Sequence, residues 1–178
     1  MVMNTGTFEE RLAAGKAFEA RIMEELQRSF WSVIPATEAQ DKADKIDCWV
    51  RWKGVSYSVA IKWRDSGVDL GIAAVRPFSS LGTFRSQMAS GSVPYDRDAQ
   101  HYADLYAVGT PDGVSVYTGD SVRRAVADAL EQFAEIGAIK SNQFEVKVVE
   151  DRGATGYTSG QYKLIVYIKL NSLERVDI

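Results

Sequence analysis

The chain of 178 residues is 46% apolar and 25% charged, which is typical of one globular domain with a buried core. Its formal net charge of −3 excludes a protein that holds nucleic acid by bulk positive charge alone. A single cysteine and a single histidine exclude a zinc site of Cys and His ligands, so any metal is expected to bind oxygen atoms.

No apolar run reaches about 18 residues, the length that would indicate a membrane-spanning helix. The first residues also lack the charged and then apolar order of a signal peptide. We therefore expect a cytoplasmic protein that does not enter a membrane.

A helix is expected over residues 7–30, because Thr7 and Glu10 form a T-x-x-E capping box and apolar residues then recur at helical spacing. The apolar stripe passes through Glu19, which falls among side chains that should pack on the core. An unpaired carboxylate in that position would be costly, so Glu19 is expected to have a partner.

Residues 34–45 are read as a polar loop, and residues 45–64, KIDCWVRWKGVSYSVAIKWR, as two strands. A two-residue turn at Lys53-Gly54 fixes the register of this hairpin and places Asp47 opposite Ala60. The side-chain period of two then puts Asp47, Ala60 and Lys62 on one face of the sheet.

The remaining elements follow from turn residues and periodicity. Residues 65–95 are read as loops around a short helix near TFRSQM, and a second short helix is expected at YDRDAQHYA. Three further elements are expected: a strand pair at DLYAVGT and VSVYT, a helix over 121–137 capped by Thr118 or Asp120 and ended by Gly137, and a closing hairpin.

This order predicts a single domain of the mixed α/β or α+β class, with a central mixed sheet flanked by helices. The domain is expected to span residues 1–178, with a core at about 8–137 and a C-terminal hairpin extension at about 143–170.

The segment KIDCWV followed by YSVAIKWR, with a glutamate-bearing helix before it and ADLYAVG after it, resembles the restriction-endonuclease-like PD-(D/E)xK nuclease superfamily over about residues 8–118. The resemblance implies that Asp47 is the first acid, Lys62 the motif lysine and Glu19 the helix glutamate. It also implies that residues 104–108 form a later core strand beside the hairpin. Ala60 stands at the position of the second acid.

The resemblance implies a DNA nuclease that uses Mg²⁺, or Mn²⁺ as a substitute. Asp47 and Glu19 would hold the metal with the backbone carbonyl of Ile61, and Lys62 would polarise the attacking water or stabilise charge on the phosphate. Such nucleases often pair protomers to cut two strands, which implies a homodimer as one arrangement. A local surplus of basic residues at 42–64 is compatible with DNA contacts, which are expected from Arg64, Lys45 and Gln100.

Three explanations of Ala60 stay open. Glu19 supplies the second carboxylate, or the chain is a natural pseudo-enzyme that still binds nucleic acid, or the alanine is an inactivating substitution. The alternative function is therefore a non-catalytic nucleic-acid-binding or scaffold protein with a degenerate nuclease fold. Each residue also has a structural alternative: Asp47 pairs with Lys62 across the ladder in a salt bridge, and the Glu19 carboxylate lies in solvent at the edge of its stripe.

Overall fold

The computed structural model describes residues 7–29, 32–91, 103–137, 139–151 and 160–177. Its helices are α1 (Phe8–Ser29), α2 (Glu38–Asp44), α3 (Leu81–Ala89), α5 (Gly119–Ile136) and a 3-10 turn, η1 (Leu170–Ser172). Its strands are β1 (Ser32–Pro35), β2 (Cys48–Trp52), β3 (Val55–Trp63), β4 (Asp69–Phe78), β5 (Leu105–Thr110), β6 (Gly113–Thr118), β7 (Ile139–Lys140), β8 (Phe144–Asp151), β9 (Gln161–Lys169) and β10 (Arg175–Val176).

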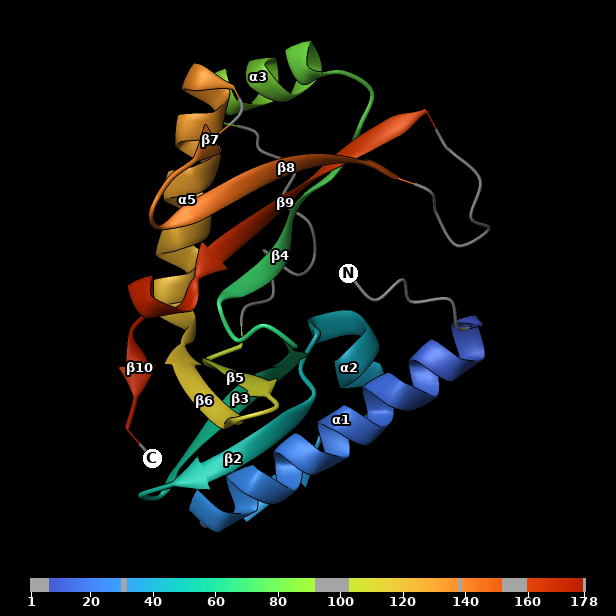
Figure 1. Ribbon diagram of the computed structural model, residues 1–178, viewed down its shortest axis with the longest axis vertical. Helices are drawn as coiled ribbons and strands as arrows, with labels where there is room; N and C mark the ends of the chain where they lie inside the picture. Colours follow the sequence, from blue (N-terminus) through green and yellow to red (C-terminus); the bar gives the residue numbers. More distant parts are fainter. Residues whose placement is uncertain (1–6, 30–31, 92–102, 138, 152–159, 178) are drawn as a thin grey trace.

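These strands form two sheets, with the order β1-β2-β3-β5-β6-β10 in the first and β4-β9-β8-β7 in the second. Figure 1 shows the second sheet and α3 at the top of the view, and the first sheet with α1 and α2 at the bottom. One apolar core is shared by α5, the second sheet and the side of the first sheet that faces them. The predicted α+β class, central mixed sheet and C-terminal hairpin are confirmed, but the hairpin belongs to a second sheet that the sequence reading did not separate from the first.

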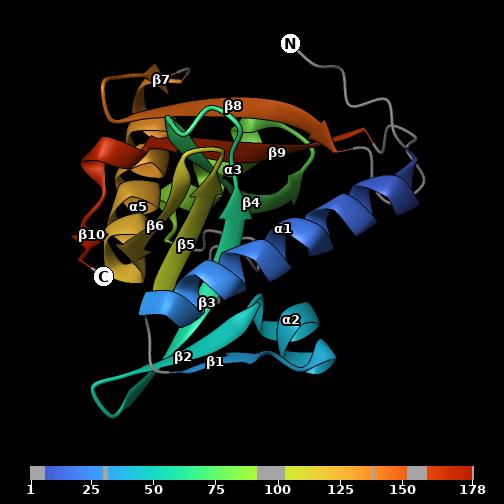
Figure 2. The same ribbon diagram turned by 60° about the horizontal axis from the view of Figure 1, so that its bottom comes forward.

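Helix α1 runs diagonally across the other face of the first sheet (Figure 2). Its Ile22 and Leu26 are buried in a second core cluster with residues of β2, β3 and β5. A Cβ atom on Gly109 of β5 would lie 2.5 Å from Ile22 Cδ1, so the missing side chain lets the helix approach the sheet closely. Phe18 stacks on Trp63 of β3, with ring centroids 4.3 Å apart.

The capping box of α1 is confirmed: the Thr7 N–H donates to Glu10 at 2.7 Å, and the Glu10 N–H donates to the Thr7 hydroxyl at 3.2 Å. The apolar stripe is only partly buried, because Leu12 is 50% exposed while Ile22 is 0% exposed. The helix therefore packs on the sheet with its C-terminal half.

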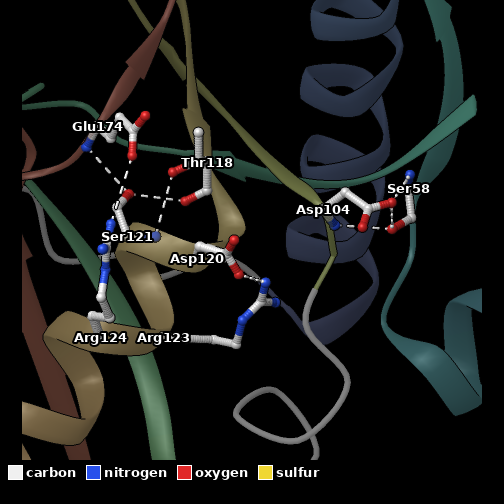
Figure 3. A network of polar contacts seen from close by, with 8 residues as sticks. All are labelled: Ser58, Asp104, Thr118, Asp120, Ser121, Arg123, Arg124 and Glu174. Atoms are coloured by element: carbon white, nitrogen blue, oxygen red, sulfur yellow. Dashed lines mark hydrogen bonds and ion pairs between the residues drawn. The ribbon is translucent and has the colours of Figure 1, made fainter. Parts of the chain in front are cut away.

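The hairpin register is confirmed from Trp52 opposite Val55 to Cys48 opposite Val59. The expected later strand is β5, which pairs in parallel with β3 and places Tyr106 beside Ala60. The Asp104 carboxylate fixes the start of this pairing, because it accepts the backbone N–H of Ser58 at 2.8 Å and the Ser58 hydroxyl at 2.9 Å (Figure 3).

Two parts of the sequence reading were wrong. The supposed loop at 34–45 contains the end of β1 and the helix α2, which begins with a capping box between Thr37 and Gln40. The supposed loops at 65–95 contain β4, whose alternate residues Leu70 and Ile72 are buried. These residues were read as loops because they are rich in glycine and serine, and the short alternation of apolar residues in β4 was overlooked. The helix near TFRSQM is confirmed as α3, and the helix expected at YDRDAQHYA lies outside the described residues, except for Ala103.

At the start of α5, the Thr118 side chain accepts the Ser121 N–H, so Thr118 rather than Asp120 is the N-cap (Figure 3). Asp120 lies in the first turn and pairs with Arg123. Gly137 ends the helix with a φ of 95°, as its position predicted. No helix in the described part of the chain is long and apolar enough to cross a membrane.

The approach of α1 to the first sheet predicts opposite effects for two identical substitutions. Gly109→Ala should destabilise the protein by about 1–3 kcal/mol, because the new methyl group would overlap Ile22 and Trp63. Gly15 lies inside α1, and a Cβ atom added there would have no neighbouring atom within 4 Å. Gly15→Ala should therefore stabilise the protein by about 0.5–1 kcal/mol. Urea denaturation of both variants measures the difference, and equal free energies of unfolding would contradict the packing described.

Candidate active site

A cleft of about 350 Å³ opens between α1, the end of β1, α2 and the start of β2. Four carboxylates and one lysine are among its lining residues, so the cleft is acidic and favours a cation. The lining residues are Lys16, Glu19 and Met23 of α1, Pro35, Ala36, Glu38 and Asp41 around α2, and Asp47.

Asp47 lies immediately before β2, where the regular pairing of β2 with β3 ends. Its N–H donates to the Val59 carbonyl at 2.9 Å, although Val59 is already the partner of Cys48. Two residues opposite one is the pattern of a β-bulge, which takes a side chain out of the regular alternation. The Asp47 carboxylate consequently reaches the cleft and accepts the Ile61 N–H at 2.6 Å.

Glu19 is the partner of Asp47 in this cleft. Partial burial raises the pKa of the Glu19 carboxyl, and the negative charge of Asp47 raises it further. Asp41 has the same effect, while the positive charges of Lys16 and Lys62 oppose it. The structure therefore brings together at one cleft the two acids that the sequence singled out, and the net shift of the Glu19 pKa is upward.

Lys62 and Ala60 do not line the cleft with Asp47. Both lie on β3, where Ala60 is 4% exposed and belongs to the core shared with the second sheet. Lys62 is half-buried and close enough to Glu19 to lower its pKa. The strands of Asp47 and Lys62 are adjacent and antiparallel as expected, but the bulge at Asp47 breaks the simple row of Asp47, Ala60 and Lys62.

A hard cation such as Mg²⁺ fits the donor atoms at this end of the ladder, because it prefers carboxylate and carbonyl oxygens. The N–H and C=O of one strand residue face the same neighbouring strand, so the Ile61 carbonyl lies on the side of Asp47. Among the described residues, no three Asp, Glu, His or Cys side chains gather to hold a metal. A cation would therefore also need backbone, water or substrate oxygens.

Cys48, next to Asp47, takes no part in such chemistry. Its side chain is fully buried, and burial together with the charges of Asp47 and Glu19 raises the pKa of the thiol to about 12. The thiol stays protonated at neutral pH, and only the thiolate is a good nucleophile or metal ligand.

The three residues expected to contact nucleic acid have different surroundings. Arg64 donates from Nη2 to the Gly71 carbonyl at 3.2 Å and so ties the first sheet to the second. Lys45 is exposed and ends α2 in the left-handed conformation, with a φ of 56°. Gln100, like His101, lies outside the described residues.

Sequence reasoning missed Lys16 and Asp41 as residues of the cleft. Lys16 was readable, because it precedes Glu19 by one helical turn and shares its face. Asp41 was missed because α2 had been read as a loop.

Comparison of the chain with protein-family models, with curated proteins and with solved structures gives no match in any of the three.

The raised pKa of Glu19 predicts a specific dependence of stability on pH. Protonated Glu19 stabilises the fold below a pH of about 4.5, and this contribution is lost as the pH rises through the raised pKa. At pH 8, Glu19→Gln should therefore raise the melting temperature by about 1–3 °C, with little difference at pH 4.

Thermal melts from pH 4 to pH 8 measure this effect, with Glu131→Gln on the exposed side of α5 as a control for the change of charge. A variant that is less stable than the parent protein at pH 8 would show that the ionised carboxylate is favourably paired. Mg²⁺ at pH 8 should raise the melting temperature of the parent protein more than that of Glu19→Gln.

Proposed function

We propose that this protein is a metal-dependent nuclease that hydrolyses phosphodiester bonds in DNA. The observation that carries the proposal is the convergence of Asp47 and Glu19, from a strand and a helix, at one partly buried acidic cleft. Two ionised carboxylates side by side repel each other and so do not stabilise the fold, but they suit the binding of a divalent cation. The resemblance of residues 8–118 to the PD-(D/E)xK nucleases agrees with this chemistry.

In this proposal Asp47, Glu19 and the Ile61 carbonyl would hold Mg²⁺, and the bound cation would supply neutralisation of charge on the scissile phosphate and activation of water. The hydrogen bond from the Ile61 N–H keeps the Asp47 carboxylate oriented before substrate arrives. Lys62, whose positive charge is close enough to Glu19 to lower the pKa of that carboxyl, stabilises the negative charge that develops on the phosphate.

The second candidate is a nucleic-acid-binding protein without catalytic activity. Its specific support is Ala60, which leaves the position of the second motif acid without a carboxylate. The described part of the chain also shows no group of three metal-ligating side chains. Both candidates share DNA as the partner, so cleavage decides between them.

Asp47→Asn should reduce Mg²⁺- or Mn²⁺-dependent cleavage of DNA by at least about 100-fold, because the amide still accepts the Ile61 N–H but lacks the charge. Asp41→Asn removes a carboxylate from α2 in the same cleft and should retain activity within a few-fold. The assay covers single-stranded, duplex, nicked and branched DNA. A parent protein that binds these substrates and cuts none would support the binding-protein candidate.

Ala60→Glu separates the explanations of the alanine. The residue lies in the apolar core beside Tyr106, so a glutamate there should lower the melting temperature by more than about 5 °C and give no gain in cleavage. A gain that Asp47→Asn then abolishes would contradict this expectation, and would indicate that the alanine replaces a catalytic acid.

A further inference from the structure

In the described part of the chain, the second sheet has one buried face and one half-exposed face. Along β9, Leu164, Val166 and Ile168 are buried in the shared core, whereas the side chains between them are half-exposed. Helix α5 contacts β4, β8 and β9, and its buried residues belong to the same core. The half-exposed side chains of β9 therefore stand on the opposite face. This outer face has no role in the cleft at Asp47.

Tyr167 lies on the outer face of β9, which is a central strand of this sheet. Its neighbours across the ladders are Gly71 on β4 and Glu145 on β8. A Cβ atom on Gly71 would lie 3.0 Å from Cε1 of Tyr167 and 2.5 Å from Nη2 of Arg64. The glycine thus makes room for an aromatic ring and a guanidinium group side by side on the sheet.

A lysine and an arginine lie beside this ring. The Lys147 ammonium lies 5.1 Å from the Tyr167 ring centroid, in the geometry of a cation–π contact. Lys147 also pairs with Glu145 at 3.8 Å, which offsets the nearest acid. By ladder position, the charged residues on this face with described side chains are Arg64, Lys147, Lys163 and Lys169 against Asp69 and Glu145. Cations therefore predominate here on a chain whose net charge is −3.

We propose that this outer face binds single-stranded nucleic acid without sequence preference. A half-exposed aromatic ring on the outer face of a sheet offers a stacking surface for an unpaired base, and the lysines and arginine on the same face attract the phosphates on either side. The bases of a duplex are already stacked on one another, so duplex DNA binds this face more weakly. The proposal goes beyond the cleavage chemistry, because it requires neither a metal nor Asp47.

The test is fluorescence anisotropy of the full chain with a labelled oligothymidylate of about 20 nucleotides, in EDTA so that cleavage does not interfere. Tyr167→Ala should weaken binding of the oligonucleotide by about 5- to 100-fold relative to the parent protein. Tyr167→Phe should bind as the parent protein does, because the stacking ring is kept. Tyr162→Ala is the matched control: Tyr162 lies on the same strand, contacts Phe78 of the buried face and is 40% exposed. Its binding should equal that of the parent protein.

Lys163→Gln gives an independent measurement should Tyr167→Ala fold poorly. It should make the dependence of log affinity on log salt shallower by about 0.7, the value for one phosphate contact on a single strand. Oligouridylate in place of oligothymidylate tells whether RNA and DNA are both accepted.

Several results would overturn the proposal. Among them are unchanged binding by a folded Tyr167→Ala variant and equal losses in Tyr167→Ala and Tyr162→Ala. Duplex DNA binding as tightly as the single strand would also do so. Full competition by polyglutamate would assign the face to acidic proteins instead.

Discussion

The close approach of α1 to the first sheet determines where the candidate site forms. Ile22 packs against Gly109, where even one Cβ atom would collide with it. Phe18 stacks on Trp63, which fixes the rotation of the helix about its axis. Glu19 lies between these two anchors and one turn before Ile22, so its carboxylate lies at the N-terminal end of β2, beside Asp47. The position of Glu19 is thus determined by the packing of its apolar neighbours Phe18 and Ile22 on the first sheet.

This arrangement makes the cleft a source of strain for the fold. Partial burial and the charge of Asp47 both disfavour ionised Glu19, and Lys16 and Lys62 compensate only in part. Glu38 is less affected, because the ion pair with Lys42 lowers the pKa of its exposed carboxyl. The unfavourable charge is therefore concentrated on Glu19. Perturbed carboxyls in a cleft are a common mark of functional sites, since stability alone would favour their replacement.

The sequence predicted the parts of the fold that depend on local signals. The capping box of α1, the turn at Lys53-Gly54 and the register from Trp52 to Cys48 are all written in neighbouring residues. The bulge at Asp47 was not readable, because it depends on which carbonyl the Asp47 N–H finds. The division into two sheets was not readable either, because β4 pairs with β9, far along the chain. Local sequence patterns indicate which residues form the site, whereas pairing between distant strands determines where their side chains point.

The second sheet also bears on the meaning of Ala60. Leu70, Ile72 and Ala60 belong to one core, so the face of β3 that would present a second motif acid is covered by the second sheet and α5. A carboxylate at position 60 would be buried among apolar side chains, where ionisation is costly. In the proposed nuclease, the second acid therefore comes from the opposite side of the first sheet. Helix α1 is the element packed there, and Glu19 is the acid that it carries to the cleft.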